Sequence, residues 1–121
     1  MKKCMFIVDD NDSCLTLVAS AFENDYKVLT FTSAKKIFTF FEKMIPDIIF
    51  MDNEMPEING FEAITKIKEN DNWKNIPIIL MTGWVTDTIK EKANELGVKS
   101  VLAKPFSMKQ AIETVNIILN Q

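Results

Sequence analysis

The sequence DIIFMDNEMPEINGFE, residues 47–62, joins the patterns of two structural elements across a short loop. Residues 47–51 form an apolar run of strand length, and Asp52 follows it directly. Pro56 and Gly60 are residue types that shape turns, and apolar residues at helical spacing begin after them. The stretch therefore predicts a strand, a loop that starts at an aspartate, and a helix.

The same alternation extends in both directions along the chain. Further apolar runs of strand length lie at residues 4–8, 27–31, 76–81 and 99–103. Amphipathic segments separate the runs. Their apolar positions are Leu15, Val18, Ala19 and Phe22; Ile37, Phe38 and Phe41; Phe61, Ile64 and Ile67; Ile89, Ala93 and Leu96; and Ala111, Ile112, Val115, Ile118 and Leu119.

Capping residues support these helices. Ser33, Thr86 and Ser107 precede helical segments, and Gly97 follows the fourth one, where a left-handed residue would end it. Strands that alternate strictly with helices predict an α/β fold, a doubly wound parallel sheet of five strands. Ligands of such sheets bind outside the carboxyl ends of the strands.

Composition narrows the class of protein. The chain has 121 residues, 47% hydrophobic and 26% charged, which predicts one globular domain and excludes a multidomain enzyme. A net charge of -3 without a run of like charges argues against nucleic acid as a partner. The sequence contains no histidine, which excludes a Ser-His-Asp triad, a His-liganded zinc and a phosphohistidine of its own.

The two cysteines and the lengths of the apolar runs indicate in which cellular compartment the protein lies. Cys4 and Cys14 have no CxxC spacing, so we expect reduced thiols in the core. The run 4–8 is too short for a signal peptide, and no stretch reaches the roughly eighteen apolar residues of a membrane span. We therefore expect a cytoplasmic protein without a membrane partner.

Polar residues follow four of the predicted strands. They are Asp9 and Asp10, then Asp52, Thr82 and Lys104. Three converging carboxylates repel one another unless a cation binds between them, and oxygen ligands favour Mg2+, with Mn2+ as a substitute. Beside such an ion Asp52 could attack a phosphoryl group, while Lys104 and Thr82 bind phosphoryl oxygens.

Each of these residues also has an ordinary interpretation. An aspartate pair after a strand is often a helix cap. Asp52, Thr82 and Lys104, taken singly, are common turn, strand and surface residues. Their joint placement at the ends of four strands of one sheet favours a functional site.

Four segments in this order resemble the receiver domain of two-component response regulators, in length its single-domain, CheY-like members. The segments are MFIVDDND (5–12), DIIFMDNEMPEINGFE (47–62), PIILMTGW (77–84) and VLAKPF (101–106). The resemblance implies a flavodoxin-like (βα)5 receiver fold with strand order 2-1-3-4-5. It also implies a single receiver domain over residues 1–121, with no output domain.

The resemblance also implies roles for the acidic residues. Asp52 would accept a phosphoryl group from a histidine kinase or a histidine phosphotransfer protein and form an aspartyl phosphate. Asp10 would bind Mg2+ directly, Asp9 through water, and Asp52 and the backbone carbonyl of Glu54 would complete the protein ligands.

The resemblance further implies how the phosphoryl group is bound and how the protein meets its partners. Thr82 and Lys104 would bind phosphoryl oxygens, and the peptide bond before Pro105 would be cis. Phosphorylation would pull Thr82 toward the phosphate and repack the fourth strand, fourth helix and fifth strand. An effector protein would then bind the face of the fourth helix, fifth strand and fifth helix. Such a protein catalyses only its own phosphorylation and dephosphorylation, and it is a monomer or a phosphorylation-dependent dimer.

Three positions depart from the family pattern or flank the site. Val101 stands where receivers usually carry an aromatic residue or histidine that follows the hydroxyl of Thr82. We expect Glu54, through its charge, and Trp84, packed over the loop or the partner face, to alter the lifetime of the aspartyl phosphate. Phe106, Trp84 and Ile89 are candidates for the partner face, with a place at the edge of the core as the alternative for Phe106.

Other functions stay open at this point. Val101 is compatible with a degenerate receiver that binds partners without phosphorylation. A haloacid-dehalogenase-type phosphatase is suggested by residues 10–12, but Asp9 intervenes and the chain is short. Nucleotide binding is weaker still, because no glycine-rich loop follows the first strand.

Overall fold

The computed structural model describes residues 2–119. Residues 1, 120 and 121, which the single-domain prediction includes, lie outside the described range. The strands are β1 (Lys3–Val8), β2 (Tyr26–Phe31), β3 (Ile48–Asp52), β4 (Ile78–Thr82) and β5 (Ser100–Ala103). The helices are α1 (Asp12–Phe22), α2 (Lys35–Phe40), α3 (Gly60–Lys68), α4 (Asp87–Glu95) and α5 (Met108–Leu119).

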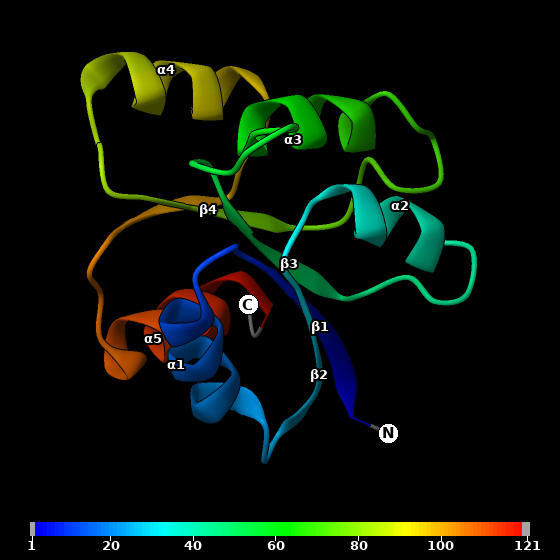
Figure 1. Ribbon diagram of the computed structural model, residues 1–121, viewed down its shortest axis with the longest axis vertical. Helices are drawn as coiled ribbons and strands as arrows, with labels where there is room; N and C mark the ends of the chain where they lie inside the picture. The colour runs from blue at the N-terminus through cyan, green and yellow to red at the C-terminus, as the bar shows by residue number, and fades with distance from the viewer. Residues whose placement is uncertain (1, 120–121) are drawn as a thin grey trace.

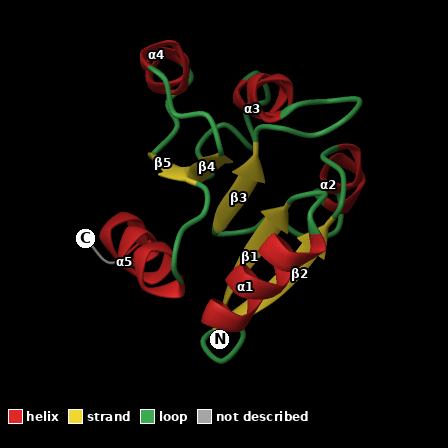
Figure 2. Cartoon of the chain, turned by 60° about the vertical axis from the view of Figure 1, so that its left-hand side comes forward, coloured by secondary structure: helices red, strands yellow, loops and turns green. Residues whose placement is uncertain are grey.

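The strands form one parallel sheet in the order β2-β1-β3-β4-β5, so the predicted fold and strand order are confirmed. Helices α1 and α5 cover one face, and α2, α3 and α4 cover the other (Figures 1 and 2). Every residue of β3 and β4 is buried, as the nearly continuous apolar runs predicted.

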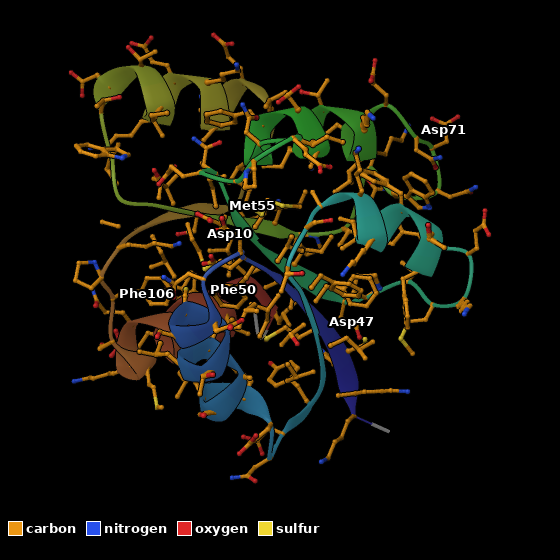
Figure 3. The ribbon with its side chains drawn as sticks, viewed as in Figure 1. Asp10, Asp47, Phe50, Met55, Asp71 and Phe106 are labelled. Atoms are coloured by element: carbon orange, nitrogen blue, oxygen red, sulfur yellow. The ribbon has the colours of Figure 1, made fainter. Side chains whose placement is uncertain are left out.

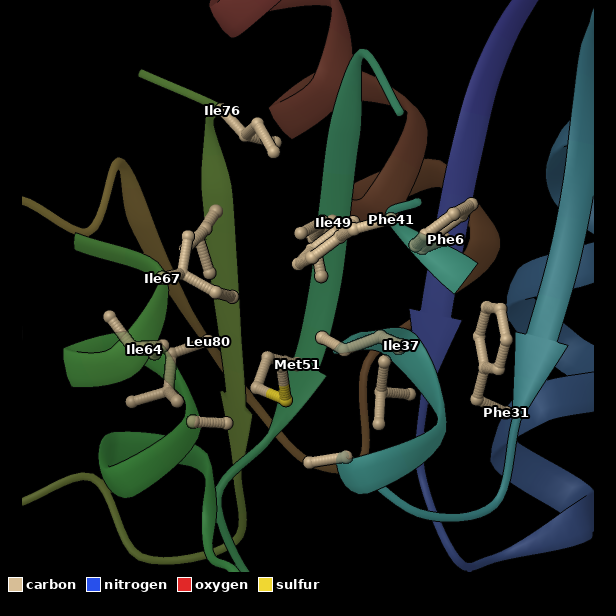
Figure 4. Packing of buried hydrophobic residues seen from close by; sticks show 14 of the residues in the cluster. Phe6, Phe31, Ile37, Phe41, Ile49, Met51, Ile64, Ile67, Ile76 and Leu80 are labelled. Carbon is tan, nitrogen blue, oxygen red and sulfur yellow. The ribbon is translucent and has the colours of Figure 1, made fainter. Parts of the chain in front are cut away.

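A separate hydrophobic cluster fills each of the two layers between helices and sheet. On the side of α2 and α3, Phe6, Phe41 and Ile49 pack together with Ile64 and Leu80 (Figure 4). These side chains are at most 4% exposed. Apolar burial on both faces fixes the central strands, and with them the positions of the residues at their carboxyl ends.

The bounds of all five predicted strands differ from the structure by one or two residues. β1 and β2 each begin one residue earlier than predicted, at Lys3 and Tyr26. β3 begins at Ile48, because the carboxylate of Asp47 accepts a hydrogen bond from the amide of Cys4 at 2.7 Å before the ladder starts. β4 begins at Ile78 and extends to Thr82, because the amide of Ile76 bonds back to the carbonyl of Trp73 in a turn. β5 begins at Ser100 rather than at residue 99.

Two of the three predicted N-caps are confirmed. The hydroxyls of Thr86 and Ser107 accept hydrogen bonds from amides three residues further along the chain. Gly97 follows the C-cap of α4 in the left-handed conformation, with a φ of 76°. The prediction that Ser33 caps α2 was wrong, since α2 begins at Lys35 and its N-cap residue is Ala34, which makes no side-chain capping hydrogen bond. Ile112, predicted as a core position of α5, is 37% exposed, since only Ala111 and Val115 of that helix are fully turned to the sheet.

Within residues 2–119, none of the helices combines the length and apolar character needed to cross a bilayer.

Candidate functional site

The carboxyl ends of the central strands bring three predicted acidic residues together. Val8 pairs with Met51, so Asp9 and Asp52, one residue further on, are neighbours. One carboxylate oxygen of each of Asp9, Asp10 and Asp52 lies within 4.8 Å of the others. Asp9 and Asp52 are buried and Asp10 is exposed, at the end of the sheet near the Met55 loop (Figure 3).

Lys104 reaches both buried carboxylates from the loop after β5. Its Nζ donates to Oδ2 of Asp9 at 2.7 Å and to Oδ1 of Asp52 at 3.0 Å. Its backbone amide donates to the carbonyl of Thr82 at 2.8 Å. The Lys104-Pro105 peptide bond is cis, as the resemblance implied.

The electrostatic environment differs between the two buried aspartates. Burial raises the pKa of Asp52 to about 7, and the charge of Asp9 adds to this, against the hydrogen bond from Lys104. Burial also acts to raise the pKa of Asp9, but hydrogen bonds from Cys14, Lys104 and the Asn11 amide outweigh it, and this pKa is lowered. The two carboxylates hold the pKa of Lys104 above its usual value despite burial.

This donor set fits a divalent cation. Three carboxylates cluster here and one ammonium, that of Lys104, bonds to two of them, so the cluster carries more negative than positive formal charge. All three side chains offer oxygen, the ligand type that Mg2+ and Mn2+ prefer. Asp10, which is exposed, leaves the cluster open to solvent for the water molecules that Mg2+ retains.

The loop after Asp52 is folded back tightly against its own start. A Cβ on Gly60 would lie 2.7 Å from the carbonyl oxygen of Asp52 and 2.8 Å from Cα of Asn53, so only glycine fits here. Asn59 caps α3 through a reciprocal pair with Glu62. The turn predicted from this sequence is confirmed, and it holds the backbone of Asp52 in place.

The remaining predicted residue, Thr82, forms a hydrogen bond with the side chain of Glu54, a contact that the sequence did not predict. The Thr82 hydroxyl donates to Oε2 of Glu54 at 2.7 Å, and the Gly83 amide donates to Oε1 of the same carboxylate at 2.8 Å. The Trp84 amide donates to the Thr82 hydroxyl at 3.1 Å. Glu54 was expected to act through its backbone carbonyl and its charge; only its position two residues after Asp52 hinted at this contact.

The aspartate pair does not cap α1. The side chain of Asn11 accepts from the Cys14 amide at 3.0 Å, and Oδ1 of Asp9 accepts from the Asn11 amide at 2.9 Å. Both cysteines are free, as expected: Cys4 is buried in the core, and Cys14 is half-buried and packs against the edge of the α1–α5 cluster. Burial and the neighbouring Asp9 raise the pKa of the Cys14 thiol to about 12.

The candidates for the partner face separate into two groups. Phe106 is 7% exposed and packs in the α1–α5 layer, so it belongs to the core and not to the partner face. Trp84 is 72% exposed, and therefore does not pack over the loop. Ile89 and Val101 are half-buried against the other layer.

Comparisons with known proteins agree with this architecture. A family model described as "Response regulator receiver domain" matches residues 5–116. The polar-differentiation response regulator DivK of Brucella anthropi is 28% identical over 120 residues, which cover 98% of each chain.

Solved structures show the same fold. The chemotaxis protein CheY4 of Vibrio cholerae has a TM-score of 0.92 at 24% identity and covers 98% of this chain and 100% of its own. The receiver domain of the sensor histidine kinase PA1611 from Pseudomonas aeruginosa, solved with a magnesium ion coordinated in the active site cleft, has a TM-score of 0.88 at 22% identity over the full length of both chains. The chain belongs to the receiver domain family of two-component response regulators.

Proposed function

We propose that this receiver accepts a phosphoryl group on Asp52 in a Mg2+-dependent reaction and thereby changes its binding to a partner. The observation that carries the proposal is the position of the Asp52 carboxylate. It is buried at the end of β3, within 4.8 Å of the carboxylates of Asp9 and Asp10, and 3.0 Å from the ammonium of Lys104. A nucleophile, a cation site and a phosphate-binding cation thus meet in one place.

Each residue has a task in this proposal. Asp10 and Asp52 would hold Mg2+ directly and Asp9 through water, and the backbone carbonyl of Glu54 would be the remaining protein ligand. Mg2+, or Mn2+ as a substitute, would supply positive charge against the repulsion between the carboxylate and the incoming phosphoryl group. Lys104 and Thr82 bind phosphoryl oxygens, and the salt bridges to Asp9 and Asp52 orient Lys104 for this role.

The transfer is a displacement at phosphorus. A carboxylate oxygen of Asp52 forms the new O–P bond as the bond between phosphorus and the donor atom breaks, and the electron pair of that bond leaves with the donor. Acetyl phosphate, for example, leaves acetate without needing a proton. Water later attacks the acyl phosphate and returns Asp52 and inorganic phosphate, so the chemistry is limited to the protein itself and it is not an enzyme for other substrates.

The donor is a separate protein, a histidine kinase or a histidine phosphotransfer protein, because this chain has no histidine. The effector binds the face formed by α4, β5 and α5, which adjoins Thr82 through the pairing of β4 with β5. The protein is a monomer or dimerises when phosphorylated. With Val101 in β5, the change at Thr82 reaches this face without a rotating aromatic ring.

Intact mass after incubation with acetyl phosphate tests the proposal, with and without Mg2+. We expect one phosphoryl group on the wild type only when Mg2+ is present, none on Asp52→Asn, and normal labelling of the control Asp12→Asn, whose carboxylate lies outside the acidic cluster. Labelling of Asp52→Asn would show a different acceptor. A folded, Mg2+-bound wild type that is labelled neither by acetyl phosphate nor by any kinase would instead indicate a phosphorylation-independent interaction module.

A further inference from the structure

The carboxylate of Glu54 binds two donors at the end of β4 at once. Its two oxygens accept from the Thr82 hydroxyl at 2.7 Å and from the Gly83 amide at 2.8 Å. Thr82 is fully buried, whereas Glu54 is an exposed residue of the loop after β3. The contact joins the loop after β3 to the end of β4, and its two residues are 28 positions apart in the sequence.

The Thr82 hydroxyl and the Gly83 amide each donate their single proton to the Glu54 carboxylate. A threonine hydroxyl has one proton to donate, and a backbone amide has one. The Thr82 hydroxyl also accepts from the Trp84 amide at 3.1 Å, which fixes its orientation and leaves its proton for Glu54. Neither donor can therefore serve a phosphoryl oxygen on Asp52 while both bind Glu54.

Glu54 also offers what a phosphoryl group offers, namely two anionic oxygens on one centre. Hydrogen bonds to an ionised acceptor are shorter and stronger than those to a neutral one, and the distances of 2.7 and 2.8 Å are in that range. The amide of Glu54 itself lies 3.3 Å from Oδ1 of Asp52, so the residue that bears this carboxylate adjoins the acceptor.

We propose that the Glu54 side chain is an autoinhibitory latch, an internal substitute for the phosphoryl group that must leave Thr82 and Gly83 before phosphoryl oxygens bind there. The proposal rests on the phosphoacceptor function of Asp52. The latch lowers the affinity of the site for phosphoryl groups and ties the loop after β3 to the end of β4 in the unphosphorylated protein. Its release frees the Glu54 carboxylate beside the exposed Trp84 and gives phosphorylation a structural output that needs no aromatic residue at position 101.

Beryllofluoride, a stable analogue of the phosphoryl group, tests the latch without turnover. The probe is titrated in the presence of Mg2+ into the wild type, Glu54→Ala, Glu54→Gln and the control Glu57→Gln. Glu57 lies in the same loop and carries the same charge, but pairs with Lys35 at 3.0 Å on the surface. We expect about tenfold tighter binding for Glu54→Ala, a smaller gain for Glu54→Gln, which keeps one acceptor oxygen, and wild-type affinity for Glu57→Gln.

The amide signal of Gly83 distinguishes a latch from a general effect on stability. In the free proteins this signal differs between the wild type and Glu54→Ala, because the hydrogen bond to the carboxylate is lost. In the beryllofluoride complexes the two signals coincide, because Glu54 no longer binds Gly83 in either protein. A difference that persists in the complexes would mean that Glu54 is never released, and the latch would be wrong.

The two proposals fail in different ways. If the wild type binds beryllofluoride and is labelled on Asp52, but both Glu54 variants have its affinity, the latch is refuted and the phosphoacceptor function stands. If no variant binds the probe or is labelled while Mg2+ still binds, the function is refuted, and the latch with it.

Discussion

The site consists of two halves. A positively charged side chain lies at the centre of one half, and a negatively charged side chain lies at the centre of the other. In the acidic half, made of Asp9, Asp10 and Asp52, the ammonium of Lys104 lies between two buried carboxylates. In the hydroxyl half, made of Thr82 and Gly83, the carboxylate of Glu54 binds two donors. Lys104 thus has the same sign of charge as the Mg2+ proposed for its half, and Glu54 has the same sign as the phosphoryl group proposed for the other half.

The balance of charge differs between the halves. The acidic half has three carboxylates and one ammonium, so a cation would relieve repulsion there. Burial, with the charge of Asp9 as a smaller cause, raises the pKa of Asp52 to about 7. In the hydroxyl half both donors have an acceptor, so a ligand must first replace Glu54. The comparison teaches that a cation would reduce repulsion at this site, whereas a phosphoryl group would compete with a contact that already exists.

The largest expected effect follows from removing the cation of the acidic half. Lys104→Met leaves Asp9 and Asp52 buried without their ammonium, and we expect a loss of about 3 kcal/mol in the free energy of unfolding without Mg2+. Urea denaturation measures it. Lys109→Met, which alters an exposed pair at 4.0 Å, is the control and should change stability by less than about 0.5 kcal/mol. Equal losses in both variants would show that Lys104 does not hold the acidic half together.

Mg2+ itself should have the next largest effect. At a free concentration of about 100 times its dissociation constant, Mg2+ should raise the free energy of unfolding by about 2.7 kcal/mol. Asp10→Asn removes one carboxylate of the cluster and should reduce this increment, whereas Asp12→Asn, in the first turn of α1, should leave it unchanged. Thermal melts with Mg2+ or a chelator measure the increment. An undiminished increment in Asp10→Asn would place the ion elsewhere.

The pH dependence of stability isolates Asp52. Its folded pKa of about 7 lies above the ordinary value of 3.8, so between these values the folded state retains a proton that the unfolded state releases. Without Mg2+, stability should therefore fall as pH rises from 5 to 8, by roughly 2–3 kcal/mol and mostly below pH 7, and should not fall in Asp52→Asn. The lowered pKa of Asp9 and the raised pKa of Lys104 act at lower and higher pH, outside this window. An equal slope in both proteins contradicts the assignment to Asp52.

The smallest expected effect is on stability and concerns backbone strain at Glu57, in the same loop after β3 that carries Glu54. Glu57 has a φ of 67°, a left-handed backbone that costs a non-glycine residue about 1 kcal/mol, partly offset by the entropy that glycine loses. Glu57→Gly should therefore be more stable than Glu57→Ala by about 0.5 kcal/mol, since both lose the surface pair with Lys35. Denaturation of the two variants compares them. If the alanine variant is equally stable, the loop holds no strain at this residue.

Much of the fold and half of the site could be predicted from the sequence. Apolar runs of strand length and helical spacing are local signals, and they indicated the sheet and the residues that follow each strand. Asp9, Asp10, Asp52 and Lys104 meet as expected, because parallel strands end at the same edge of a sheet. The cap of α1 was less predictable, since Asn11 and not an aspartate accepts the amide of Cys14.

The amino-acid sequence by itself determined the order of elements, the central buried strands and the set of polar residues at their ends. Only the tertiary structure decided that Phe106 turns into the core, that Trp84 lies exposed, and that the carboxylate of Glu54 binds Thr82. The reason is physical. Periodicity reports which face a residue of a helix or strand presents. The hydrogen bond from the end of β4 to a loop residue 28 positions away depends instead on the distance between backbones, which the packed sheet sets.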